Sequence, residues 1–303
     1  MRIAFTGWAL LAPFIISATE PVVLQPSGRW VLDYAANSCR LSRVFGTGAS
    51  ETVLQWESTA PGQASMLAIG KPMRTFSEKV PARFLPVDHK PFDGTPETAT
   101  NKLPGILWSS APMLPEHLIE RLERQEKQRS SMPSRRPPPI VLKESDEIRA
   151  ARQAFAAAAH QLQISVRRSR PVILNTGSLG DPIKAFDRCS RDSLRDWGVD
   201  PDLEDKIVRP AFPIGVNNWF DDNDYPAAML VRGAESDVRV RLLVDASGNV
   251  TKCTSLTVFD QPSFAKVVCD KISSRARFEP AELADGTKVP SYYINLIVFR
   301  IFG

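Results

Sequence analysis

The sequence has few of the residues that bind metal ions or carry out nucleophilic catalysis. Three histidines and four cysteines occur in 303 residues, and no two cysteines have the C-x-x-C spacing of zinc sites and redox-active thiols. The net charge of +4 is small for a chain of this length, which argues against nucleic acid as a partner. We therefore predict no metal site, no catalytic residues, no cofactor and no enzymatic activity.

Long hydrophobic runs are also scarce, and the clearest one stands at the start of the chain. Arg2 is followed by residues 3–18, which carry no charge and include Pro13. As a helix this run would reach about 24 Å, which is shorter than the roughly 30 Å hydrocarbon core of a bilayer. We interpret residues 1–18 as a secretory signal peptide cleaved after Ala18, so that the exported protein keeps no membrane span. The alternative is an uncleaved segment that anchors the protein in the inner membrane.

The four cysteines all follow this segment, and an oxidising compartment favours their pairing. Cys189 lies on the apolar face of a predicted helix, from which it can meet Cys39 on an early strand. Cys269 likewise faces inward from a later helix, within reach of Cys253 on the strand before it. We predict these two disulfides, which would stabilise the fold by about 5 and about 3 kcal/mol respectively.

Residues 22–205 are predicted to form a mixed, β-rich domain. Gly- and Pro-containing turns separate short strands at residues 30–34, 39–45, 53–56 and 66–69. Apolar residues at three- and four-residue spacing predict helices at residues 144–162 and 182–197, and a charged surface helix at 116–129. An extended insertion is predicted at the Pro-rich residues 130–139, between the helices at 116–129 and 144–162.

Residues 218–303 are predicted to form a second, smaller α+β domain, so the chain as a whole is α+β. The patterns predict, in order, a helix at 225–232, a strand at 238–244, a strand at 250–258, a helix at 262–276 and a strand at 291–301. We expect an antiparallel three-stranded sheet packed with helices. Both faces of the last strand are apolar, so one face packs on the helix and the other is covered or is a docking surface.

This order resembles the TonB C-terminal domain family over residues 218–303. The residues that carry the resemblance are Tyr225-Pro226-Ala227-Ala228, the strand-turn-strand Val238 to Val250 around Asp245 and Gly248, Phe264, the segment Arg275 to Ala281, and the closing strand Ile294 to Ile301.

The resemblance implies a periplasmic protein of the cell envelope that binds a protein or peptide partner. Family members are energy transducers: they join a proton-driven motor in the inner membrane and pull on outer-membrane receptors in transmembrane transport. Their C-terminal sheet takes up a strand from the receptor. The resemblance implies partner contacts at Trp219, Asp224, Tyr225, Pro226, Tyr292, Tyr293 and Asn295. Packing within the domain is the alternative role for Trp219.

One further feature bears on the function. The Pro-rich stretch is too short to cross the periplasm, which predicts a protein that binds a TonB-dependent receptor without transducing force. The alternative function places an enzyme or a small-ligand site in residues 22–205, with the TonB-like domain as a tether.

Overall fold

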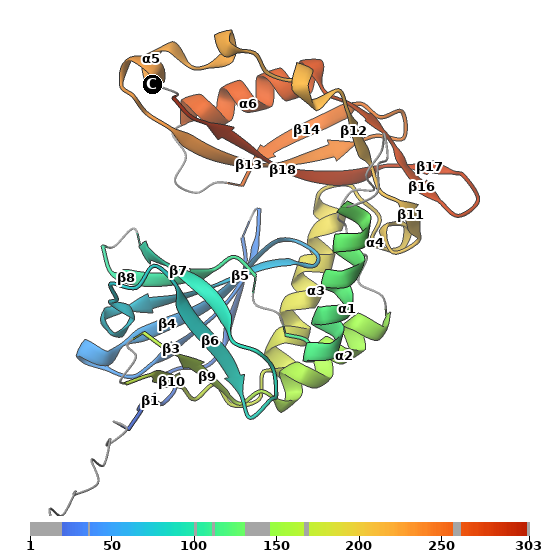
Figure 1. Ribbon diagram of the computed structural model, residues 1–303. Coiled ribbons are helices and arrows are strands. Elements are labelled where there is room, and N and C mark those ends of the chain that lie inside the picture. The colour runs from blue at the N-terminus through green and yellow to red at the C-terminus, as the bar shows by residue number, and fades with distance from the viewer. Residues whose placement is uncertain are drawn as a thin grey trace, which may run out of the picture.

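The computed structural model describes residues 20–301, apart from residues 36, 100–101, 111–112, 131–145, 167–169 and 257–261. The predicted signal peptide lies outside the described residues, and so does the predicted Pro-rich insertion except for Ser130. The chain is α+β, with a large β-rich region followed by a smaller region that carries its own sheet (Figure 1).

The β-rich region contains one ten-stranded sheet in the order β1-β10-β9-β6-β7-β8-β5-β4-β3-β2. Its strands are β1 (Val22–Leu24), β2 (Val31–Tyr34), β3 (Cys39–Phe45), β4 (Thr52–Ala60), β5 (Gln63–Gly70), β6 (Val80–Leu85), β7 (Phe92–Thr98), β8 (Pro104–Trp108), β9 (Gln161–Ile164) and β10 (Val172–Leu174). The chain after β1 forms an isolated bridge from Pro26 to Phe45 at the end of β3, so segments near the two borders of the sheet come together.

Helices lie along one side of this sheet: α1 (Glu116–Ser130), α2 (Asp146–Ala158), α3 (Gly180–Asp196) and the short α4 (Pro201–Glu204) (Figure 1). Short 3-10 helices, η1 (Gly48–Ser50) and η2 (Lys71–Met73), join strands. The core between the sheet and the helices contains buried Trp56, Trp108, Phe84 and Phe155. Alternation of buried and half-buried residues along β4 shows why this sequence forms a strand with one face in the core.

His89 is a structural histidine in this core. Its ring lies against Phe84, Phe92 and Phe155. Nε2 accepts a hydrogen bond from the Phe84 backbone N–H at 2.8 Å, so Nδ1 carries the proton and donates it to the Lys90 carbonyl. Burial lowers the pKa of His89. The imidazole therefore acts as a neutral hydrogen-bonding spacer between two backbone groups.

One predicted helix ends earlier than the sequence analysis expected. The helix predicted at residues 144–162 stops at Ala158, and Gln161–Ile164 form β9. The sequence here alternates polar and apolar residues, which fits a strand, and β9 pairs on both sides with β6 and β10. Sheet pairing therefore overrides the helical spacing at the end of this segment.

The C-terminal region contains a three-stranded antiparallel sheet in the order β14-β13-β18. Its strands are β13 (Ser236–Val244), β14 (Val250–Ser255) and β18 (Ser291–Phe299), and its helices are α5 (Ala227–Val231) and α6 (Pro262–Arg275), preceded by η3 (Val216–Asn218) and η4 (Asp222–Asp224). Helix α6 covers one face of the sheet (Figure 1). The predicted antiparallel three-stranded sheet is confirmed.

Two small sheets connect the chain before residue 218 to this region. Strand β11 (Ile207–Arg209) pairs with β16 (Ala281–Leu283), which also pairs with β17 (Lys288–Val289). Strand β12 (Phe212–Ile214) pairs with β15 (Arg277–Glu279). Residues 207–214, which lie between the two predicted domains, therefore pair with strands of the C-terminal region.

The turn between β13 and β14 depends on a glycine. Gly248 has a φ of +85°, and a Cβ atom at this position would lie 1.9 Å from the Phe278 carbonyl oxygen. The Phe278 backbone N–H in turn donates to the Gly248 carbonyl at 2.9 Å. Asp245 closes the turn by accepting hydrogen bonds from the backbone N–H groups of Ser247 and Asn249. This contact between turn and β15 explains why the motif needs a glycine here.

Both predicted disulfides are present. Cys39 on β3 is bonded to Cys189 on α3, with a Cα–Cα distance of 6.0 Å. Cys253 on β14 is bonded to Cys269 on α6, with a Cα–Cα distance of 5.4 Å. The first bridge joins the β-rich sheet to the helices that cover it, and the second joins the C-terminal sheet to its helix.

We expect the two bridges to differ in their effect on stability. The Cys39–Cys189 bridge closes a far longer loop, so the double variant Cys39→Ser/Cys189→Ser should lose about 5 kcal/mol of unfolding free energy, against about 3 kcal/mol for Cys253→Ser/Cys269→Ser. Urea unfolding followed by circular dichroism measures both losses. Equal losses, or a larger loss for the second pair, would contradict the loop-length argument.

Candidate functional site

The last strand, β18, forms one border of the C-terminal sheet. Among the described strands it pairs with β13 alone, through nine residues from Ser291 to Phe299. On the side facing α6, Tyr293, Ile297 and Phe299 pack into the core of the domain. Its other edge carries no strand among the described residues. An unpaired edge of this kind is a template for a further strand.

The backbone groups at this open edge can be identified from two hydrogen bonds. The Leu296 N–H is bonded to the Asn295 side chain at 2.9 Å and not to β13. Arg239, which lies opposite Leu296 on β13, accepts instead from Leu256 on the far side. Because polar groups alternate in direction along an antiparallel strand, Ile294, Leu296 and Val298 direct their N–H and C=O groups to the open edge.

The side chains of this alternating set lie on the sheet face opposite α6. Leu296 and Val298 are 46% and 50% exposed, whereas Tyr292 is only 9% exposed. Tyr292 packs with Ala60, Leu194 and Val199 of the β-rich region. The open part of β18 therefore runs from about Ile294 to Val298, and the first region covers its start.

Arg241 of β13 fixes this junction between the two regions. Its side chain is 3% exposed, and its guanidinium carbon lies 3.5 Å from the centroid of the Trp197 ring. Its N–H groups donate to the backbone oxygens of Thr59 and Asn37 at 3.2 and 3.3 Å. Burial lowers the pKa of Arg241 to about 10, so the group stays charged at neutral pH. Carbonyl dipoles and an aromatic face thus take the place of a carboxylate partner.

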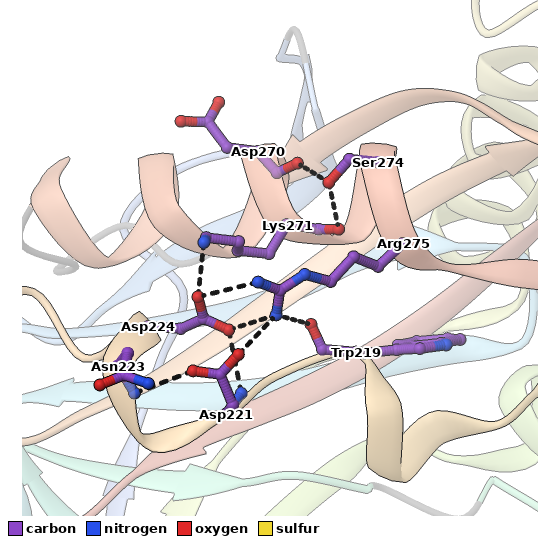
Figure 2. Close-up of polar contacts among 8 residues, drawn as sticks. All are labelled: Trp219, Asp221, Asn223, Asp224, Asp270, Lys271, Ser274 and Arg275. Carbon is purple, nitrogen blue, oxygen red and sulfur yellow. Dashed lines mark hydrogen bonds and ion pairs between the residues drawn. The ribbon is translucent and has the colours of Figure 1, made fainter.

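A second charged group lies on the α6 side of the domain (Figure 2). Asp224 is buried, and its carboxylate lies 2.5 Å from the Lys271 Nζ and 2.6 Å from an Arg275 nitrogen. It also accepts the Asp221 backbone N–H at 2.9 Å, while Arg275 reaches the Trp219 carbonyl. Lys271 and Arg275 are one helical turn apart, so α6 holds residues 219–224 with two cations.

These contacts determine the ionisation of Asp224. Burial alone raises the pKa of Asp224, but hydrogen bonds from Lys271, the Asp221 backbone and Arg275 outweigh it and lower the pKa to about 2. The carboxylate is therefore charged and bound within the domain. It fixes the segment before α5 and is not displayed to a partner.

The aromatic residues beside Asp224 also pack internally. Trp219 is buried against Phe278, and its indole N–H donates to the Ile214 carbonyl at 3.1 Å. Tyr225 packs edge-on against Phe299, and its hydroxyl donates to the Ala234 carbonyl at 2.6 Å. Trp219 thus takes the packing role given above as the alternative to partner contact.

The seven residues implied as partner contacts therefore separate into groups. Trp219, Asp224 and Tyr292 are buried, Tyr225 and Tyr293 are half-buried in the domain core, and Pro226 occupies the position before the first residue of α5. Asn295 alone of the seven bonds a backbone group at the open edge.

Sequence reasoning missed Arg241, Lys271, Leu296 and Val298. The alternation along β18 left open whether its second face is covered or is a docking surface, and it could not show that one part of that face is covered and another exposed.

Two features are absent from the residues that the structure describes. In that part of the chain, no group of three or more His, Cys, Asp or Glu residues is placed to hold a metal ion. None of its helices is both long enough and apolar enough to cross a membrane.

Residues 221–301 match the family described as Gram-negative bacterial TonB protein C-terminal. The match spans α5, the β14-β13-β18 sheet and α6, and it confirms the resemblance for this part of the chain. It supports, in general terms, a TonB-like periplasmic protein that interacts with other proteins. A comparison with curated proteins found no match.

The charge cluster predicts a specific dependence on acid. Because the folded pKa of Asp224, about 2, lies below its ordinary value of 3.8, its contribution to stability is complete above pH 3.8 and is lost as the pH falls toward 2. Asp224→Asn should lower the unfolding free energy by about 2 kcal/mol at neutral pH and flatten this acid limb. Urea unfolding at several pH values measures both effects. Asp222→Asn, at an exposed carboxylate, is the matched control. If Asp224→Asn loses stability toward acid as steeply as the parent chain does, the assignment is contradicted.

The junction is tested by a pair of arginines on one strand. Arg241→Ala removes the donor to two backbone oxygens and the cation on Trp197, and it should cost about 3 kcal/mol of unfolding free energy. Arg239→Ala, two residues away on the same face but exposed, should change it by less than about 0.5 kcal/mol. Small-angle scattering should show a larger radius of gyration for Arg241→Ala only. If the two variants change the unfolding free energy and the radius of gyration to the same extent, Arg241 does not hold the junction.

Proposed function

We propose that this protein is a periplasmic partner-binding protein in which β18 takes up an extended peptide by β-strand addition. The partner in this proposal is a TonB-dependent outer-membrane receptor, and the process is outer-membrane transport. The observation that carries the proposal is the open edge at residues 294–298, with backbone groups directed outward in a domain that matches a TonB C-terminal family. Main-chain hydrogen bonds supply affinity in this mode of recognition.

The surroundings of β18 favour this edge over the opposite border of the sheet. The two hydrogen-bonding groups of Leu296 point outward, and within the described part of the chain the Asn295 side chain is the partner of the N–H. A side-chain amide can turn away to make room for a backbone carbonyl of the incoming strand. Strand β14, at the other border, has six residues and is linked to α6 by a disulfide. The longer, simpler edge is therefore the better template.

The first region sets one end of the peptide site. Tyr292 is packed under the β-rich region, so an added strand pairs from about Ile294 toward Val298 and meets exposed Leu296 and Val298 on the outer face. The proposal includes no catalytic step: the protein binds and positions a segment of its partner.

The test compares two substitutions at one position. Leu296→Pro removes an N–H that β13 does not use, so the fold should persist while an added strand loses a hydrogen bond and meets the proline ring. Leu296→Ala keeps that N–H. Affinity for synthetic peptides from receptor plug segments, measured by fluorescence polarisation, should fall at least about tenfold for Leu296→Pro and less for Leu296→Ala.

Hydrogen exchange provides the second measurement. Peptide binding should protect the amides of Leu296 and Val298 and leave those of β14 unchanged. Circular dichroism confirms that both variants are folded. Saturable binding that is equally strong in Leu296→Pro, or protection confined to β14, would rule out this edge as the site.

A further inference from the structure

A cavity of about 590 Å³ lies where α2 and α3 meet the β4–β5 turn and β18. Its wall includes Tyr292, so the same strand that has an open edge also borders this cavity. Pockets for small molecules have volumes of this order and occur preferentially where domains meet. The peptide proposed above lies on the edge of β18, which makes this a separate site.

Positive charge gathers on the α3 side of the cavity. Lys184, Arg188 and Arg191 line it from positions four and three residues apart, which places them on one face of the helix. Like charges at this spacing repel each other and disfavour the helix. Arg149 and Arg152 of α2 line the same space. Five basic side chains thus converge from two neighbouring helices.

The acidic residues of the cavity offset only part of this charge. Asp187 accepts from Arg152 and Gln153, both at 2.9 Å. Asp205 lies 2.5 Å from Arg191. Lys184 and Arg188 form no ion pair among the described residues, and both are exposed.

Glu204 of α4 also lines the cavity, so five basic side chains there face three acidic ones. The other residues of the wall are uncharged. Ser58 and Ser190 are buried and share a hydrogen bond of 2.7 Å at its inner side. Phe186, Leu194 and Tyr292 add apolar surface. A ligand that fits this wall has a compact body with hydrogen-bonding groups and an anionic end directed at Lys184 and Arg188.

We infer that this cavity binds a small organic anion that carries carboxylate or phosphate groups. Basic side chains that converge on a partly enclosed space bind such groups through charge-assisted hydrogen bonds. A ligand in this cavity also contacts Tyr292, the residue through which β18 packs against the β-rich region.

Isothermal titration calorimetry of the intact chain tests this with three probes: inorganic phosphate, succinate and uncharged succinamide. We expect saturable binding of at least one anion and none of succinamide. Binding of phosphate alone assigns phosphorylated ligands, and binding of succinate alone assigns carboxylates. The double variant Lys184→Gln/Arg188→Gln should lower the affinity for that anion at least about tenfold.

The matched control is Lys71→Gln/Lys102→Gln, which removes the same charge from exposed sites away from the cavity. It should leave the affinity unchanged, and both double variants should melt at the temperature of the parent chain. The inference is overturned if neither anion binds saturably, if the cavity variant binds as tightly as the parent, or if the control variant weakens binding equally.

Discussion

The position of β18 is the constraint on which the C-terminal structure depends. One edge is used by β13 along nine residues, one face is buried under α6, and the start of the other face is buried under the β-rich region. Three of its four sides are thus occupied, at least in part, by the chain itself. The remaining edge, over residues 294–298, pairs with no other strand of the described chain, which is the condition that strand addition needs.

Two buried charges hold the surroundings of this strand, and they do so by different means. Asp224 is compensated by Lys271 and Arg275 in direct ion pairs, which ties the segment before α5 to α6. Arg241 is compensated by neutral oxygens and the Trp197 ring, which ties β13 to the β-rich region. A buried charge is costly without such partners, so each charge specifies one arrangement of the segments that meet around it.

The β-rich region therefore contacts the C-terminal domain in more than one way. It covers the start of β18 through Ala60, Leu194 and Val199, and it supplies most of the wall of the cavity that Tyr292 completes. The connecting residues 207–214 form strands that pair within the C-terminal unit, so the two regions contact each other through side chains. Tyr292 belongs at once to the junction, the cavity and the border strand, which makes it the physical link among the three.

The sequence by itself determined strands β2 to β5, helices α1 to α3 and both disulfides, because periodicity reports which side of a helix or strand faces the core and therefore which cysteines can meet. It also determined the order of α5, β13, β14, α6 and β18. It could not separate Arg239 from Arg241, which occupy equivalent outward positions on β13, yet one is exposed and the other buried. The end of α2 at Ala158 was likewise decided by the pairing of β9 with β6 and β10. Only tertiary structure decides such cases, because covering a polar face, enclosing a cavity and leaving an edge open depend on segments that are distant in the sequence.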